Sequence, residues 1–166
     1  MSIEPPWALL SVSRDEAAQF LVVFARCEFA LKAVKRFRKT TPKLAADWNT
    51  FATTVAPKFS FADDAKLEEA VKYLLDRPPK KEVVVEGNLA WTHADPGGTD
   101  VHRLSVYVRR VRNNLFHGAK WVARESDEPG RDQILVNAAL TVLSALIQLD
   151  GEVHYAFNDW PPREGW

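Results

Sequence analysis

The chain has 166 residues, of which 46% are hydrophobic and 27% charged, so its length and composition predict one globular domain and exclude a disordered chain. Its 22 Lys and Arg residues balance 22 Asp and Glu residues, which gives a formal net charge of zero. A neutral chain is not a histone-like or wholly basic protein that coats nucleic acid.

The first predicted element is a long helix. Ser13 and Glu16 have the Ser-x-x-Glu spacing of a capping box, and apolar residues then recur at steps of four and three. We predict a helix from about Arg14 to Lys39. The single cysteine, Cys27, lies on the apolar stripe, where we expect a small buried hydrophobic residue. One thiol also excludes an internal disulfide and a four-cysteine zinc site.

Two shorter helices are predicted next, each with one apolar face. Pro42 starts the first of them, and Pro57 stops it. Asp63 and Asp64 open the second, because acidic residues favour the first turn of a helix, and it ends at Arg77.

Residues 78–99 break the helical pattern. They contain the β-branched run Val83 to Val85 and a Pro-Gly-Gly turn, which predict an irregular loop or a short hairpin. A fourth helix begins near Thr99 or Asp100, and Gly118 is placed to end it.

A polar turn at residues 125–132 precedes the last predicted helix, whose apolar face runs from Leu135 to Val153. The sum is a single all-α domain, a bundle of four or five helices with a core of about residues 13–157 and an irregular tail at residues 158–166. The N-terminal residues lack a signal-peptide pattern, and the longest apolar region falls short of a membrane span. The histidines have no zinc-ligand spacing. We therefore expect a cytoplasmic protein without membrane contact, metal site or cofactor.

The most informative stretch is Arg112-Asn113-Asn114-Leu115-Phe116-His117-Gly118, at the end of the fourth predicted helix. His117 would lie in the last turn, whose exposed carbonyl groups favour imidazolium, and a histidine that titrates near neutrality is a credible general acid or base. Arg112 offers a forked cation that suits a phosphate. Asn113, one turn from His117, can hold the imidazole or a phosphate oxygen. These residues indicate chemistry on a phosphodiester, although the same spacing also fits a solvated helix face.

Helical geometry limits how the pair can work. Arg112 and His117 are five residues apart, about 140° around a helix, so a regular helix does not point both at one site. They would cooperate across two helices packed around a symmetry axis, or if the helix loosens at Gly118.

This Arg-Asn-Asn-Leu-Phe-His-Gly stretch, together with the order of the predicted helices, resembles the HEPN superfamily. The motif of that superfamily is an Arg, usually followed by a polar residue, and a His after four to six intervening residues; here four residues separate Arg112 from His117. The resemblance implies a HEPN-like helical bundle that dimerises, with both motifs facing one cleft. It also implies a metal-independent endoribonuclease of toxin or defence systems, in which the RNA 2′-hydroxyl attacks its neighbouring phosphate. Arg112 would stabilise the pentacoordinate phosphate, His117 would transfer protons and Asn113 would orient them.

The resemblance implies RNA as substrate, a second copy of the chain as partner, and an antitoxin or nucleotidyltransferase partner as well. Some HEPN toxins have a tyrosine two residues after the His that a nucleotidyltransferase modifies, whereas this chain has Ala119 there. Some members of the superfamily only bind ligands or other proteins. The alternatives are therefore a non-catalytic binding or scaffold module, and an antitoxin or adaptor bound to a nucleotidyltransferase.

Three further residues are candidates for supporting roles. Glu28 lies beside the apolar stripe of the first helix, where HEPN proteins often carry an acid, so we expect it to pair with Arg112 or His117, or else to be a surface acid. Arg109 and Arg110 precede the motif and either steer phosphate or form a solvated face.

The charges are unevenly distributed along this neutral chain. Residues 29–46 and residues 101–124 each contain six Lys or Arg residues and no acid. If the fold places these two basic segments on one side, a basic cleft coexists with a neutral molecule, and we expect activity that falls with added salt.

Overall fold

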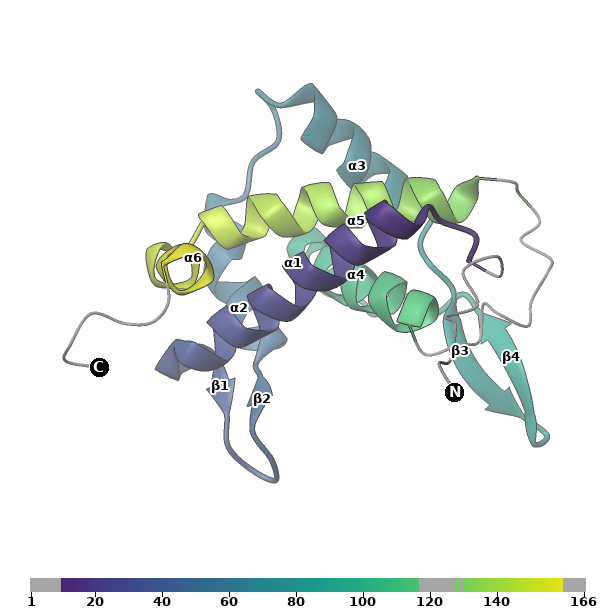
Figure 1. Cartoon of the computed structure of the whole chain (residues 1–166), viewed down its shortest axis with the longest axis horizontal. Helices are drawn as coiled ribbons and strands as arrows, with labels where there is room; N and C mark the ends of the chain where they lie inside the picture. The colour runs from purple at the N-terminus through teal and green to yellow at the C-terminus, as the bar shows by residue number, and fades with distance from the viewer. Residues whose placement is uncertain (1–9, 117–127, 129, 160–166) are drawn as a thin grey trace, which may run out of the picture.

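The structure is a computed structural model that describes residues 10–116, 128 and 130–159 (Figure 1). Over these residues the chain is mostly helical, as expected, with six α-helices and, in addition, two small antiparallel sheets. His117, Gly118 and Ala119 lie outside the described residues, as do the end of the predicted tail and half of the predicted polar turn.

Helix α1 (Arg14–Ala33) begins as predicted, because the Ser13 side chain accepts a hydrogen bond from the backbone of Glu16. Its apolar stripe is buried, and Cys27 is among the fully buried residues. The helix ends at Ala33 rather than Lys39. A 3₁₀ turn then buries the ring of Phe37, which contacts Phe51 edge-on at 5.3 Å between ring centroids.

A short hairpin, not a helix, follows that turn. Strand β1 (Arg38–Lys39) pairs antiparallel with β2 (Ala45–Ala46), and Pro42 lies in the loop between them. Helix α2 (Trp48–Val55) starts only after Asp47, whose carboxylate caps the Thr50 backbone amide at 3.2 Å. The prediction that Pro42 opens a helix is therefore wrong: the cap that the helix needs is at Asp47.

The next two elements agree better with the sequence. A 3₁₀ turn (Ala56–Lys58) follows α2. Pro57 lies in the first positions of this turn, where a proline costs no hydrogen bond. Helix α3 (Ala65–Asp76) is capped by Asp64, which accepts from the Leu67 amide at 2.9 Å. It ends before Pro78, as predicted.

The break in the helical pattern is a β-hairpin, which confirms one of the two expected forms. Strand β3 (Lys81–Val85) pairs antiparallel with β4 (Asn88–Thr92). The turn residues Glu86 and Gly87 both have positive φ, 50° and 80°, as a two-residue turn that matches strand twist requires. Helix α4 (Asp100–Phe116) follows with the predicted start.

The last predicted helix is two helices. Helix α5 (Arg131–Gln148) stops and α6 (Gly151–Asn158) leaves at an angle of 114°. The break occurs at Asp150, whose buried carboxylate accepts hydrogen bonds from the backbone amides of Glu152 and Val153 and so starts a new helix. Apolar periodicity continues across the break, which is why the sequence predicts one helix.

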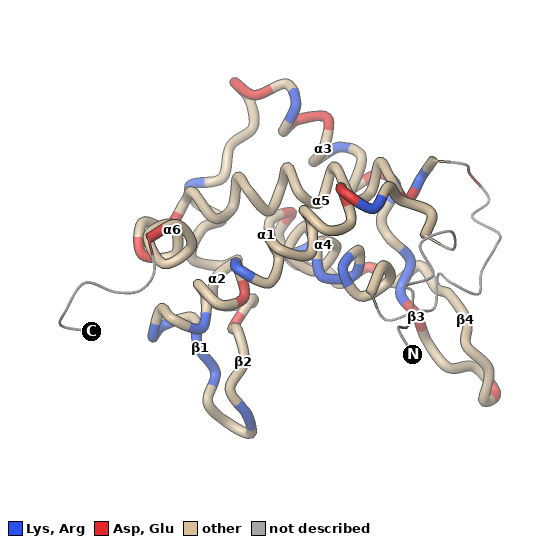
Figure 2. The backbone as a smooth tube through the Cα atoms, viewed as in Figure 1, with Lys and Arg blue, Asp and Glu red and all other residues tan. Residues whose placement is uncertain are grey.

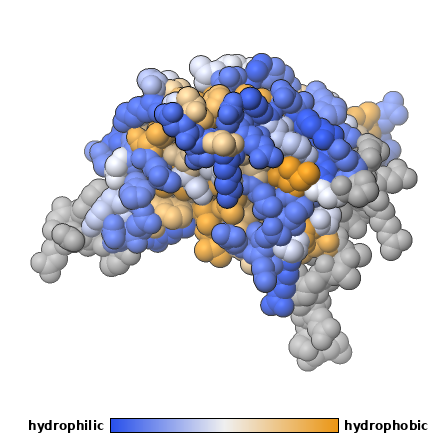
Figure 3. Space-filling view, turned by 90° about the horizontal axis from the view of Figure 1, so that it is seen from above, coloured by the Kyte–Doolittle hydropathy of each residue, from blue (hydrophilic) through white to orange (hydrophobic). Residues whose placement is uncertain are grey.

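Helix α5 lies at the centre of the bundle, with α3 and α4 packed on it and α1 crossing in front (Figure 1). The core is continuous and includes apolar side chains from all six helices. Hydrophilic residues cover most of the face seen in Figure 3, with smaller hydrophobic patches between them. Among the described helices none is by itself long and apolar enough to cross a membrane; α5 and α6 reach that composition only as a bent pair.

Candidate functional site

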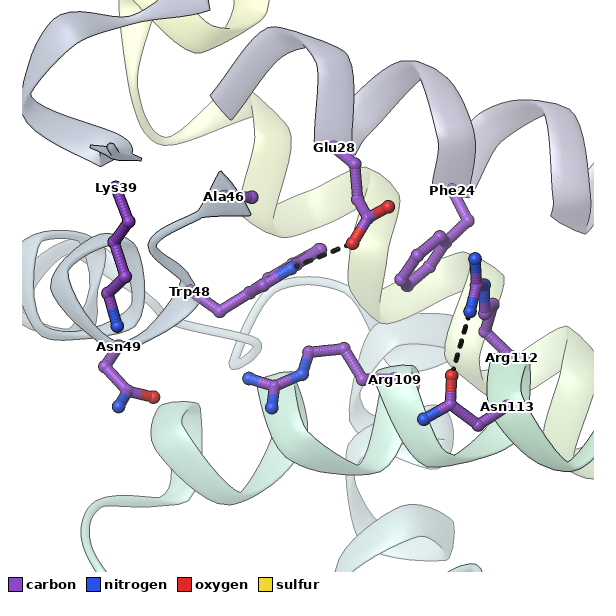
Figure 4. A pocket seen from close by; sticks show the side chains of 9 residues that line it. All are labelled: Phe24, Glu28, Lys39, Ala46, Trp48, Asn49, Arg109, Arg112 and Asn113. Carbon is purple, nitrogen blue, oxygen red and sulfur yellow. Dashed lines mark hydrogen bonds between the residues drawn. The ribbon is translucent and has the colours of Figure 1, made fainter. Parts of the chain in front are cut away.

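A polar pocket of about 290 Å³ lies where α1, the β1–β2 hairpin, α2 and α4 meet (Figure 4). It brings together four of the residues predicted from the sequence and several that the sequence did not indicate. Its lining consists of Phe24, Glu28, Lys39, Ala46, Trp48, Asn49, Arg109, Arg112 and Asn113.

Helix α4 supplies the basic side of the pocket. Arg109, Arg112 and Asn113 are three and four residues apart, so they share one face, while Val108 and Val111 turn into the core. Amphipathic packing thus presents one half of the predicted motif to the pocket.

Arg110 does not line this pocket. Its guanidinium carbon lies 5.4 Å from the centre of the Tyr107 ring, and the charge of Asp95 acts on it. One helical step of about 100° separates it from Arg109. The sequence grouped the two arginines, and the fold gives them different surroundings.

The Arg112 side chain is held by contacts on two sides. Its Nη1 donates a hydrogen bond to Asn113 Oδ1 at 3.0 Å, and its guanidinium carbon lies 5.4 Å from the centre of the Phe24 ring. Phe24 in turn stacks on Trp48, with ring centroids 5.5 Å apart and an angle of 24° between the planes. A cation on an aromatic face is attracted to the ring, so this layer orients the guanidinium before any ligand arrives.

Glu28 is the acidic residue of the pocket lining. Its Oε1 accepts a long hydrogen bond from Trp48 Nε1, at 3.5 Å (Figure 4). The structure therefore places the carboxylate in the same pocket as Arg112, and its hydrogen-bond partner is Trp48. Burial lowers the pKa of the nearby Arg109, and the negative charge of Glu28 partly opposes that effect.

Arg109 is a partly buried cation. Burial lowers the pKa of its guanidinium from the ordinary value, against the smaller opposing effect of Glu28. Across the described residues, its guanidinium has neither a hydrogen-bond partner nor a carboxylate within 4.0 Å. Burying a charge without such a partner costs free energy, so the position favours an anion from outside the chain.

Five lining residues were not indicated by the sequence as site residues, and three of them carry a polar group: Lys39, Trp48 and Asn49. These three come from β1 and the first turn of α2, and the acid-free run of residues 29–46 pointed toward Lys39 alone among them. Lys39 Nζ lies 3.3 Å from a carboxylate oxygen of Asp47 and still borders the pocket.

The two basic segments meet at this pocket, since Lys39 belongs to one of them and Arg109 and Arg112 belong to the other (Figures 2 and 4). Other basic residues of the two segments are neutralised locally. Arg36 pairs with Asp150 at 2.6 Å and with Glu152, and Arg103 pairs with Asp95 at 2.8 Å.

Two neighbours of the motif have other positions. Asn114 is buried and donates a hydrogen bond to the Lys80 carbonyl at 2.9 Å, which ties α4 to the start of the β3–β4 hairpin. His117 follows the last residue of α4 in the sequence and lies outside the described residues. Over the part of the chain that the structure describes, no three His, Cys, Asp or Glu side chains gather in a group that fits a metal ion.

No family model, curated protein or solved structure matches the chain. The site is therefore interpreted from its own residues and from the motif in the sequence.

Proposed function

We propose that the protein is a metal-independent endoribonuclease of the HEPN type, a toxin or defence component that acts as a homodimer. The observation that carries the proposal is that Arg112 and Asn113, the first two residues of the motif, line a polar pocket together with two further cations and a carboxylate. A pocket with more cations than acids favours an anionic ligand, and a phosphodiester fits the forked guanidinium.

The reaction is a transesterification. The 2′-oxygen of a ribose attacks the adjacent phosphorus, the bond from phosphorus to the 5′-oxygen breaks, and the products are a cyclic phosphate and a free 5′-hydroxyl. One proton leaves the 2′-hydroxyl and one arrives at the 5′-oxygen. A histidine can act as general base and general acid in these transfers, and we propose this role for His117. Arg112 stabilises the extra negative charge of the pentacoordinate phosphate.

The Arg112 geometry suits this role because its side chain is already held by Phe24 and Asn113. A donor that is in place before charge develops needs no reorganisation during the reaction, which is the basis of electrostatic catalysis. A second copy of the chain would bring the other motif to the same cleft.

The test is cleavage of single-stranded RNA in EDTA by the wild type, by His117→Ala and by Arg112→Ala. We expect cleavage by the wild type and losses of at least about 100-fold in both variants, the usual size of an acid–base or oxyanion contribution. His154→Ala is the matched control, since His154 is an exposed residue of α6, and it should cleave like the wild type.

Equal cleavage by the wild type and His117→Ala contradicts the proposal. If no variant and no wild-type preparation cleaves RNA, with or without Mg²⁺, the binding or scaffold module is the better assignment.

A further inference from the structure

We propose that Lys39, Asn49 and Arg109 form a phosphate-binding subsite beside Arg112, which holds a neighbouring phosphate of the same RNA strand. The identity of the ligand rests on the proposed function. The arrangement of these three side chains supports the subsite whatever the identity of the ligand.

The two arginines that line the pocket point in different directions. Arg109 and Arg112 are neighbours on one face of α4, with about 5–6 Å between Cβ atoms three residues apart. Their guanidinium groups nevertheless point apart: Arg109 extends toward Trp48 and Asn49, whereas Arg112 lies against Phe24 (Figure 4). Two cations that diverge within one pocket suit two anionic groups of one ligand better than a single one.

The guanidinium of Arg109 is partly buried in the pocket wall and makes no hydrogen bond to a described residue. Arg112, by contrast, is hydrogen-bonded to Asn113. Five N–H donors that are partly shielded from water, and that no described residue uses, are available to a planar or tetrahedral oxyanion.

The wall of the pocket opposite α4 contributes further polar groups. Asn49 and Lys39 border the same end of the pocket as Arg109 and come from α2 and β1 (Figure 4). The amide of Asn49 supplies two further N–H donors. Lys39 supplies a second positive charge, although its Nζ also lies 3.3 Å from a carboxylate oxygen of Asp47. The donors therefore converge from two sides on one volume, with Glu28 displaced toward the Phe24 end.

The experiment measures binding, so that it does not depend on cleavage. The probe is a fluorescein-labelled 2′-O-methyl RNA oligonucleotide, which lacks the attacking hydroxyl, and affinity is measured by anisotropy over a range of salt concentrations. We expect Arg109→Gln to raise the Kd by about tenfold and to lower the slope of log K against log salt by about 0.7, the value for one phosphate contact in single strands. Lys39→Gln should act in the same direction.

Two further variants separate the subsite from general charge and from folding. Arg110→Gln removes the same charge one residue away, outside the pocket, and should change the Kd by less than about twofold. Arg109→Lys keeps the charge and loses the fork, so we expect the salt slope of the wild type with an affinity between those of wild type and Arg109→Gln. Thermal unfolding of each variant shows whether it is folded.

The outcomes separate the two proposals. If wild-type protein cleaves RNA while Arg109→Gln and Arg110→Gln bind the probe equally well, the subsite is wrong and the nuclease stands. If no cleavage occurs but Arg109→Gln still loses affinity and slope, the subsite stands and the nuclease fails. Competition by inorganic phosphate at concentrations similar to the probe would identify a free-phosphate site and overturn the assignment to an RNA strand.

Discussion

Arg109 and Arg110 are adjacent in the sequence, yet only Arg109 lines the pocket. The difference arises from one helical step of about 100°, which sends Arg110 to the ring of Tyr107. The same rule unites Arg109, Arg112 and Asn113 on one face. Chemistry that needs several cations at one place is thus encoded by spacing along α4, and residue type alone does not reveal it.

At the same scale, we expect Glu28 to act as a positioning residue, and its charge can be removed without removing its hydrogen-bond acceptor. Glu28→Gln keeps an oxygen that can accept from Trp48 Nε1 and removes the negative charge beside Arg109. We expect RNA cleavage to fall about tenfold, about 1.4 kcal/mol, because an amide oxygen accepts from Trp48 more weakly than a carboxylate does, and Trp48 stacks on the Phe24 ring that Arg112 contacts.

The measurement is cleavage rate and midpoint of thermal unfolding for Glu28→Gln and, as a matched surface control, Glu69→Gln on α3. The control should leave both quantities unchanged. Unchanged activity together with unchanged stability in Glu28→Gln would rule out a role for Glu28 in the site.

At the scale of elements, one carboxylate fixes how the C-terminal helix attaches to the bundle. Asp150 caps α6 and pairs with Arg36, which lies just before β1 and the pocket. Its side chain is only 5% exposed, whereas that of Glu152, which also pairs with Arg36, is 52% exposed. The cap and the ion pair therefore join the end of α5 to the base of the β1–β2 hairpin.

Substitutions at these two acids should differ in size. Asp150→Ala removes a cap and leaves Arg36 without its buried partner, so we expect a loss of about 2–3 kcal/mol in the free energy of unfolding. Asp150→Asn keeps a capping oxygen and should cost less. Glu152→Gln alters an exposed pair and should change stability by less than about 0.5 kcal/mol.

Urea denaturation of the three variants measures these differences. A loss for Glu152→Gln as large as that for Asp150→Ala would show that the exposed pair, and not the cap, holds α6 in place.

At the scale of the whole molecule, zero net charge and a basic pocket are compatible because most acids lie outside the pocket, whose lining has three cations and one carboxylate. Arg36 and Arg103 are paired with acids, while Lys39, Arg109 and Arg112 border the pocket. Figure 2 shows this distribution, with basic positions on the β1–β2 hairpin and along α4. Neutrality therefore excludes only indiscriminate coating of nucleic acid.

The proposed shared cleft also makes a prediction for the whole molecule. Sedimentation equilibrium at micromolar concentration should give about twice the 18.8 kDa mass of the chain. The reason is that Arg112 and His117, five residues apart, are proposed to act from two copies. A monomer that cleaves RNA at full rate would contradict the shared cleft and leave the nuclease itself in place.

The sequence by itself determined the starts of α1, α3 and α4, the break in the helical pattern between α3 and α4 with a hairpin as one of its two expected forms, and the buried state of Cys27. Each of these depends on local rules: a capping side chain, a β-branched run with a turn, or an apolar repeat. It also indicated Arg112, Asn113, Glu28 and Arg109 as candidates, which the pocket brings together.

Only the tertiary structure decided the rest. The early end of α1 and the β1–β2 hairpin depend on where Phe37 is buried, and the Asp150 cap that breaks the last predicted helix is also held by an ion pair with Arg36, 114 positions away. Lys39 and Asn49 join the site for the same reason. Contacts between distant segments set these features, and local periodicity carries no record of them.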